Sequence, residues 1–231
     1  MKIKLNYFIV LSVALFLPFF GVSAGTKTAS STPKIIMLDV PFVSQAPLKE
    51  WSNPRFQDAC EEASVYMAIK WVKGEKINGD NNSLRRARNE ILSLSQYQTA
   101  KYGNFHDTSA ADTAERLIKG YYKHKRFTVK TDVTLDDIID ALKNNQAVIL
   151  PTNGRLLKNP YFSGLGPINH MIVVKGYDPN KNVFIVNDPG TKKGENFKYS
   201  AEILNKSISD YPTGVHKNRE DSKKIAIFVK K

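Results

Sequence analysis

The chain of 231 residues contains a single cysteine, Cys60. One thiol cannot form an internal disulfide, and it excludes a zinc site built from several cysteines. The sequence also lacks the HExxH pattern of zinc peptidases and the glycine-rich loops that cradle phosphates. We therefore expect no metal and no cofactor. Cys60 is an inert buried side chain, a partner in an intermolecular bridge, or a reactive group.

Acidic residues are in the minority, with 22 Asp and Glu against 34 Lys and Arg and a net charge of +12. This balance suits an anionic cell surface made of lipid head groups or wall polymers, and it is equally typical of an ordinary lysine-rich surface. The lysines are scattered rather than interleaved with aromatic residues, so we expect no nucleic-acid partner.

Long apolar runs are missing except at the N-terminus. There, Lys2 and Lys4 precede an apolar run over residues 7–22 that leads into the small-residue triplet at 22–24. This pattern predicts a secretory signal peptide over residues 1–24, cut after Ala24. An uncleaved membrane anchor is the alternative, because a spanning helix needs roughly 20 residues.

The predicted export has consequences for the rest of the chain. We expect a secreted or extracytoplasmic protein, in which residues 25–34 form a flexible spacer and residues 35–231 form a single domain, large enough for a full core. We also expect this domain to be a monomer.

Helical patterns dominate the first half of this domain and strand patterns the second, which predicts an α+β fold. Asp58 is placed as the N-cap of the Cys60 helix, with Glu61 completing a capping box, and Gly74 marks the end of that helix. We expect further helices over 84–94, 109–121, 135–144 and 201–206, and strands over 35–40, 146–151, 170–178, 182–188 and 224–229. A loop over 152–169 is long enough to suggest a functional role.

Cys60 would be the second residue of its helix, at the positive end of the helix dipole. Thiolates are stabilised there, and free N–H groups are available to an anionic oxygen. An inert cysteine would more often lie on the apolar stripe in the middle of a helix. The position therefore favours a reactive thiol with a lowered pKa.

A thiolate nucleophile needs a base and a group that orients the base. His170 stands where the long loop enters an apolar strand, and Asp188 ends the next strand, so a hairpin would make them neighbours. Asn187 is an alternative to Asp188, but strand alternation places it on the opposite face. The other histidines, His106, His124 and His216, are expected to be ordinary surface residues.

Attack on a carbonyl also requires a donor for the oxyanion, commonly a side-chain amide together with the N–H of the nucleophile. Gln45 and Gln57 are the candidates. Gln57 lies too close to the helix start to point back across it, so we favour Gln45 on the preceding loop.

The segments VPFVSQAP and QDACEEAS, followed later by NHMIVVKGYD and VNDPG, resemble the papain-like peptidases related to the double-glycine bacteriocin-leader peptidases, family thirty-nine of the cysteine peptidases. The resemblance covers about residues 38–188. It implies a papain-like fold, in which the cysteine helix packs on a sheet that carries the histidine. It also implies that Gln45, Cys60, His170 and Asp188 are the oxyanion glutamine, the nucleophile, the base and the orienting aspartate.

Two features depart from that family. Cys60 is followed by Glu61 and Glu62, where the family often has glycine after the cysteine. The leader-processing members are cytoplasmic domains of ABC transporters, whereas this chain carries a predicted export signal. Their substrate therefore does not transfer to this chain.

The first hypothesis is an exported cysteine peptidase that acts on a peptide or protein substrate. The alternatives are a surface module that binds peptide or wall polymer without catalysis, and an acyltransferase or deamidase that uses the same thioester. We expect the two loops beside Cys60 and His170 to border a groove for an extended peptide. Its expected lining is Trp51, Tyr161, Phe162, Gly164 and Gly166, and the resemblance implies cleavage after small residues.

Overall fold

The computed structural model describes residues 1–4, 33–217 and 222–231. All the helices and strands that it describes belong to the unit Pro33–Lys231, and Met1–Thr32 is a separate unit. The predicted signal peptide and spacer lie almost wholly within residues 5–32, outside the described residues. In the described part of the chain, no helix is long and apolar enough to cross a membrane.

An antiparallel sheet forms the centre of the folded unit, with the strand order β2-β7-β3-β4-β5-β6 and β1 paired to β4. The strands are β1 Ile36–Met37, β2 Phe127–Thr131, β3 Gln146–Asn153, β4 Asn169–Asp178, β5 Val183–Asn187, β6 Phe197–Ser200 and β7 Ile225–Lys230. The central strands β3 and β4 are buried along almost their whole length. Continuous apolar runs of this kind are typical of strands covered on both faces.

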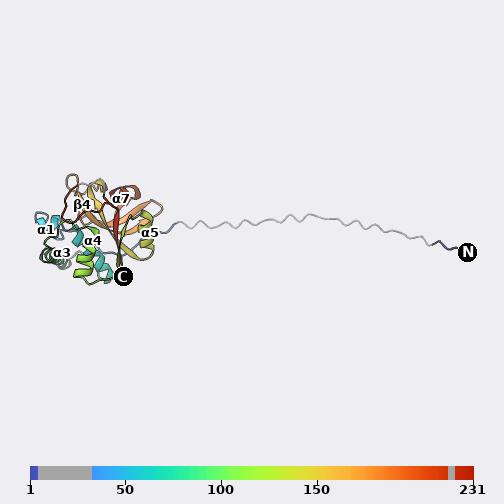
Figure 1. Cartoon of the computed structure of the whole chain (residues 1–231), viewed down its shortest axis with the longest axis horizontal. Helices are drawn as coiled ribbons and strands as arrows, with labels where there is room; N and C mark the ends of the chain where they lie inside the picture. Colours follow the sequence, from blue (N-terminus) through green and yellow to red (C-terminus); the bar gives the residue numbers. More distant parts are fainter. Residues whose placement is uncertain (5–32, 218–221) are drawn as a thin grey trace. The chain divides into compact units, whose positions relative to one another are not determined.

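The helices are α1 Pro54–Gln57, α2 Cys60–Val72, α3 Asn81–Tyr102, α4 Ala110–Thr113, the π-helix η1 Ala114–Tyr121, α5 Leu135–Lys143, α6 Gly154–Leu157 and α7 Ala201–Ser207. In the view of Figure 1, α1 and α3 lie at one end of the folded unit and α5 at the other. Helix α2 is buried at every position except Lys70 and Val72. Its Ser64 hydroxyl donates to the carbonyl of Met171 in β4, 3.1 Å away, which fixes the cysteine helix against the sheet.

The α+β class, the packing of the cysteine helix on the sheet and the β4–β5 hairpin are confirmed. Helix α5 begins with a capping box, in which the side chains of Thr134 and Asp137 each accept from the other's backbone N–H. Strands β2 and β6 were not predicted. Both lie at the edges of the sheet, so their sequences carry polar residues that weaken the strand pattern.

The capping box predicted for α2 is wrong. The helix begins at Cys60, and its N-cap, Ala59, provides no side-chain hydrogen bond. The short helix α1 ends immediately before it, so Asp58 is the C-cap of α1 and its carboxylate accepts from His106 Nδ1 at 3.0 Å. Glu61 points into the protein and does not fold back over the helix start.

Candidate active site

Cys60 is the first residue of α2 and its side chain is buried. It lines a cavity of about 700 Å³ that is also lined by Gln45 and His170. The first four N–H groups of a helix have no acceptor within the helix. The backbone N–H of Cys60 is therefore one of the free donors at the N-terminus of this helix, beside the thiol.

His170 and Asp188 form a buried pair at one end of the β4–β5 hairpin, and His170 lines the same cavity as Cys60. His170 Nε2 donates to Asp188 Oδ1 at 2.7 Å, and the two side chains are 2% and 0% exposed. Gly190 leaves room for the ring, because a Cβ at that position would lie 2.8 Å from His170 Cε1. The edge of Phe162 packs against the ring, with the centroids 5.3 Å apart.

Three more groups hold the carboxylate of Asp188. Tyr199 OH and Asn159 Nδ2 donate to Oδ2 at 2.6 and 3.0 Å, and the N–H of Gly190 donates to Oδ1 at 3.0 Å. Burial alone would raise the pKa of Asp188, but the facing imidazole and the donors from Tyr199 and Gly190 lower it below its ordinary value. Asp188 is therefore an anion that is held in one orientation.

Sequence reasoning missed both Asn159 and Tyr199. Tyr199 lies in the edge strand β6, which was not predicted, and Asn159 lies in the loop between α6 and β4. Neither position carries a sequence signal that points to Asp188. The length of the loop was the only indication that it had a functional role.

The orientation of the imidazole leaves Nδ1 for the cavity. Nε2 is used on Asp188, and within the described parts of the chain no hydrogen bond joins His170 to Cys60 Sγ. The thiol and the ring therefore line one cavity, and the buried Asp188, which does not line it, orients the ring.

The thiol of Cys60 is neutral in this arrangement, which contradicts the expected thiolate. Burial raises the pKa of Cys60 well above its ordinary value, and the Glu61 carboxylate raises it further. Sγ donates to Glu61 Oε2 at 3.1 Å. A helix N-terminus favours an anion by about 1 kcal/mol, and here it is opposed by desolvation and by a neighbouring carboxylate.

Gln45 lies beside Cys60, as expected, but its amide is already engaged. Nε2 donates to the carbonyls of Phe56 and Gln57, both at 2.8 Å, and Oε1 has no hydrogen-bond partner among the residues that the structure describes. The backbone N–H of Gln45 donates to the carbonyl of Pro189 at 2.9 Å. This bond ties the glutamine loop to the loop that carries Asp188.

The family model described as the Peptidase_C39 like family matches residues 37–213. The chain belongs to the C39-like peptidase family. A crystal structure from Bacillus anthracis, described as a putative C39-like peptidase, is similar to it with a TM-score of 0.53 and 14% identity. The match covers 86% of this chain and 99% of that one. At this identity the likeness shows the fold alone. None of the curated proteins matches the chain.

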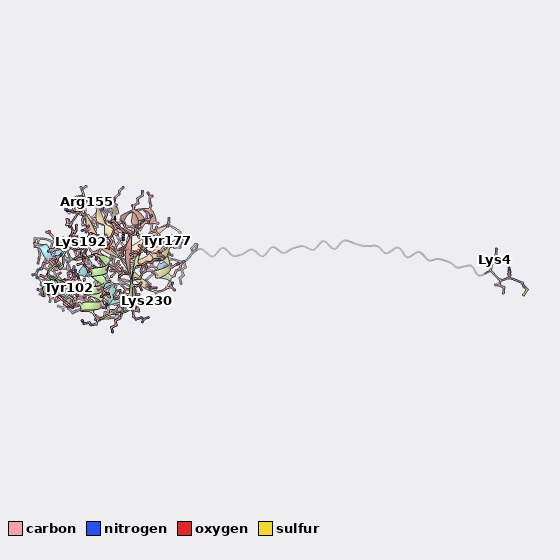
Figure 2. The ribbon with its side chains drawn as sticks, viewed as in Figure 1. Lys4, Tyr102, Arg155, Tyr177, Lys192 and Lys230 are labelled. Carbon is pink, nitrogen blue, oxygen red and sulfur yellow. The ribbon has the colours of Figure 1, made fainter. Side chains whose placement is uncertain are left out.

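Aromatic side chains line the cavity of this C39-like peptidase, as the sequence predicted. Its lining includes four of the five residues predicted for it, Trp51, Tyr161, Phe162 and Gly166, but not Gly164. Two lysines, Lys49 and Lys192, also contribute to the lining. Figure 2 labels Lys192, which follows β5 in the loop that contains Gly190.

Of the remaining histidines, His106 and His216 are exposed and His124 is half-buried, and the two exposed ones lie near the site. The ring of His216 donates to Asp107 at 3.0 Å, and both residues line the cavity. His106 pairs with Asp58 in the adjoining hollow. The ring of His124 bonds only the backbone carbonyl of Arg126, among the described residues.

Proposed function

We propose that the chain is an exported cysteine peptidase that hydrolyses peptide bonds, with Cys60 as the nucleophile, His170 as the base and Asp188 as its orienting partner. The observation that carries the proposal is the buried His170–Asp188 pair, joined at 2.7 Å, whose imidazole lines the same cavity as the single thiol. Membership of the C39-like peptidase family supports cysteine peptidase activity.

The neutral thiol requires a general base. His170 Nδ1 removes the proton from Cys60 as Sγ attacks the carbonyl carbon of the substrate. The imidazolium that forms is stabilised by Asp188, and it returns the proton to the leaving amine as the C–N bond breaks. Water then attacks the thioester carbon while His170 takes its proton; the C–S bond breaks, the imidazolium returns the proton to Sγ, and the acid product leaves.

The tetrahedral intermediate carries a negative oxygen, which the N–H of Cys60 is placed to bind. Gln45 is proposed as the second donor. It would have to release one of the carbonyls of Phe56 and Gln57 in order to donate to the oxyanion.

An extended peptide or protein segment is the proposed substrate. Trp51, Tyr161 and Phe162 offer apolar contact along the cavity, and Gly166 lets a chain approach the backbone. The net charge of +12 favours electrostatic attraction to an anionic cell surface. We further propose that the protein acts as a monomer and cuts after small residues.

The proposal is tested with the protein lacking residues 1–24 and a mixed peptide library under reducing conditions. Mass spectrometry should find cleavage products with the native chain and none with Cys60→Ala. An absence of cleavage that depends on Cys60 would reject the peptidase. Products joined to an added amine would instead indicate acyl transfer.

A further inference from the structure

Glu61 is a buried carboxyl that contacts the proposed nucleophile directly. Oε2 accepts from Cys60 Sγ at 3.1 Å, and Oε1 accepts from Tyr211 OH at 2.7 Å. Glu61 and Tyr211 are 0% and 3% exposed, and Glu61 lines the same cavity as Cys60. The mechanism given above does not use this carboxyl.

The groups around Glu61 do not compensate its charge. Cys60 and Glu62 come from α2 itself, Tyr211 from the segment after α7, Asp107 from the segment before α4, and His170 lines the same cavity from β4. The carboxylate of Asp107 is itself held by Asn169 and His216. Within the described residues, no lysine or arginine forms an ion pair with Glu61.

An anionic Glu61 opposes the formation of a thiolate, because two anions would then lie within hydrogen-bonding distance of each other in a buried site. A protonated Glu61 has the opposite effect. Its O–H can donate to the sulfur anion, and hydrogen bonds to a charged group are among the stronger ones. The protonation state of this carboxyl therefore decides how readily Sγ gives up its proton.

We propose that Glu61 controls the reactivity of Cys60, so that the thiol transfers its proton to His170 readily when Glu61 is protonated and poorly when it is ionised. In the permissive state the S–H bond breaks and an N–H bond forms at Nδ1, while the carboxyl proton stays on Oε2. Burial and the charge of Asp107 raise the pKa of Glu61 to about 7, against the lowering effect of Tyr211 and Cys60, so the change falls near neutral pH.

This inference rests on the proposed role of Cys60 as nucleophile, and alkylation by iodoacetamide tests it without peptide cleavage. The rates are measured at pH 5.5 and 8.5 for the native chain and for Glu61→Gln. We expect similar rates at pH 5.5, where Glu61 is protonated. At pH 8.5 we expect Glu61→Gln to react about tenfold faster or more, because a neighbouring like charge shifts a pKa by roughly one unit or more.

Glu62→Gln is the matched control. Glu62 is equally buried and adjacent in sequence, but it accepts from Gln98 and does not contact Sγ. Glu62 raises the pKa of Cys60 less than Glu61 does, so the rates of Glu62→Gln should stay close to those of the native chain and, at pH 8.5, well below those of Glu61→Gln. The proposal would be overturned if the ratio of the alkylation rate of Glu61→Gln to that of the native chain were the same at pH 5.5 and 8.5.

Tyr211→Phe keeps the carboxyl and provides a second test if Glu61→Gln does not fold. The hydrogen bond from Tyr211 lowers the pKa of Glu61, so its loss should keep Glu61 protonated to a higher pH. We expect Tyr211→Phe to be alkylated faster than the native chain at pH 7.5, and equal rates would count against the proposal. A chain that shows these effects but cleaves no peptide would reject only the peptidase.

Discussion

His170 Nε2 lies 2.7 Å from Asp188 Oδ1, and both side chains are buried. Replacing Asp188 with Asn removes the charge that stabilises the imidazolium. We expect turnover to fall by up to about 10⁴-fold, the loss typical of such a change in a triad. Two side chains donate to Oδ2 of Asp188, and the NH₂ group of Asn at that place could not accept from them. The melting temperature should therefore drop. Steady-state kinetics and thermal unfolding measure the two effects.

Tyr199→Phe is the control for this prediction, because it keeps the carboxylate and removes one donor from Oδ2. The bond from Tyr199 lowers the pKa of Asp188, so without it Asp188 should protonate at a higher pH. Activity should therefore be close to native at neutral pH and fall earlier as the pH is lowered. Native turnover in Asp188→Asn would show that Asp188 does not orient the base.

Gln45→Ala should lower turnover by roughly 10²- to 10³-fold if Gln45 donates to the oxyanion. Gln57→Ala is the matched control, since Gln57 is exposed and its amide bonds only the carbonyl of Trp51 in the described structure. The kinetic comparison also requires native-like unfolding for both variants. If the two glutamine variants had equal turnover, Cys60 N–H would be left as the proposed donor.

The stability of the fold should depend on pH through Glu61. Its pKa rises from 4.5 to about 7 on folding, so the folded chain keeps a proton that the unfolded chain loses between these values. The free energy of unfolding therefore falls by about 3 kcal/mol as the pH rises through this window. Asp188 acts oppositely, because its lowered pKa gives a contribution that is lost only below about pH 4.

Urea unfolding of the native chain and Glu61→Gln at several pH values measures this dependence. The stability of Glu61→Gln relative to the native chain should increase between pH 4.5 and 8. If the difference in stability between Glu61→Gln and the native chain were constant across this range, folding would not raise the pKa of Glu61.

Export remains a prediction from residues 1–24. Expression in a secreting host followed by N-terminal sequencing should find Gly25 as the first residue of the mature protein. Recovery of the chain with Met1 intact, on the membrane, would favour the uncleaved anchor.

The sequence was sufficient to place His170 and Asp188 together, because a hairpin between two apolar runs brings the start of one strand near the end of the other. It also placed the thiol at a helix start and the aromatic residues at the cavity. These inferences depend on local patterns. The same kind of local pattern gave a wrong capping box at Asp58, because α1 occupies the residues directly before it.

The ionisation of Cys60 could not be predicted from the helix start alone. It depends on burial by the sheet and on the inward orientation of Glu61, which Tyr211 fixes from 150 residues further along the chain. The partners of Asp188 are likewise remote in sequence. Contacts of this kind follow from the tertiary fold and leave no periodic signal.

The most direct test of the proposed catalytic site is the rate at which a peptide carrying a thiol-reactive vinyl sulfone modifies Cys60 at neutral pH. Intact-mass measurements would compare the native chain with His170→Ala and with His106→Ala, a control histidine that pairs with an aspartate in the adjoining hollow. We expect His170→Ala to react about 10²-fold more slowly or worse, the contribution typical of a general base, and His106→Ala to match the native chain. Equal rates for His170→Ala and the native chain would contradict the role of His170 as the base that activates Cys60.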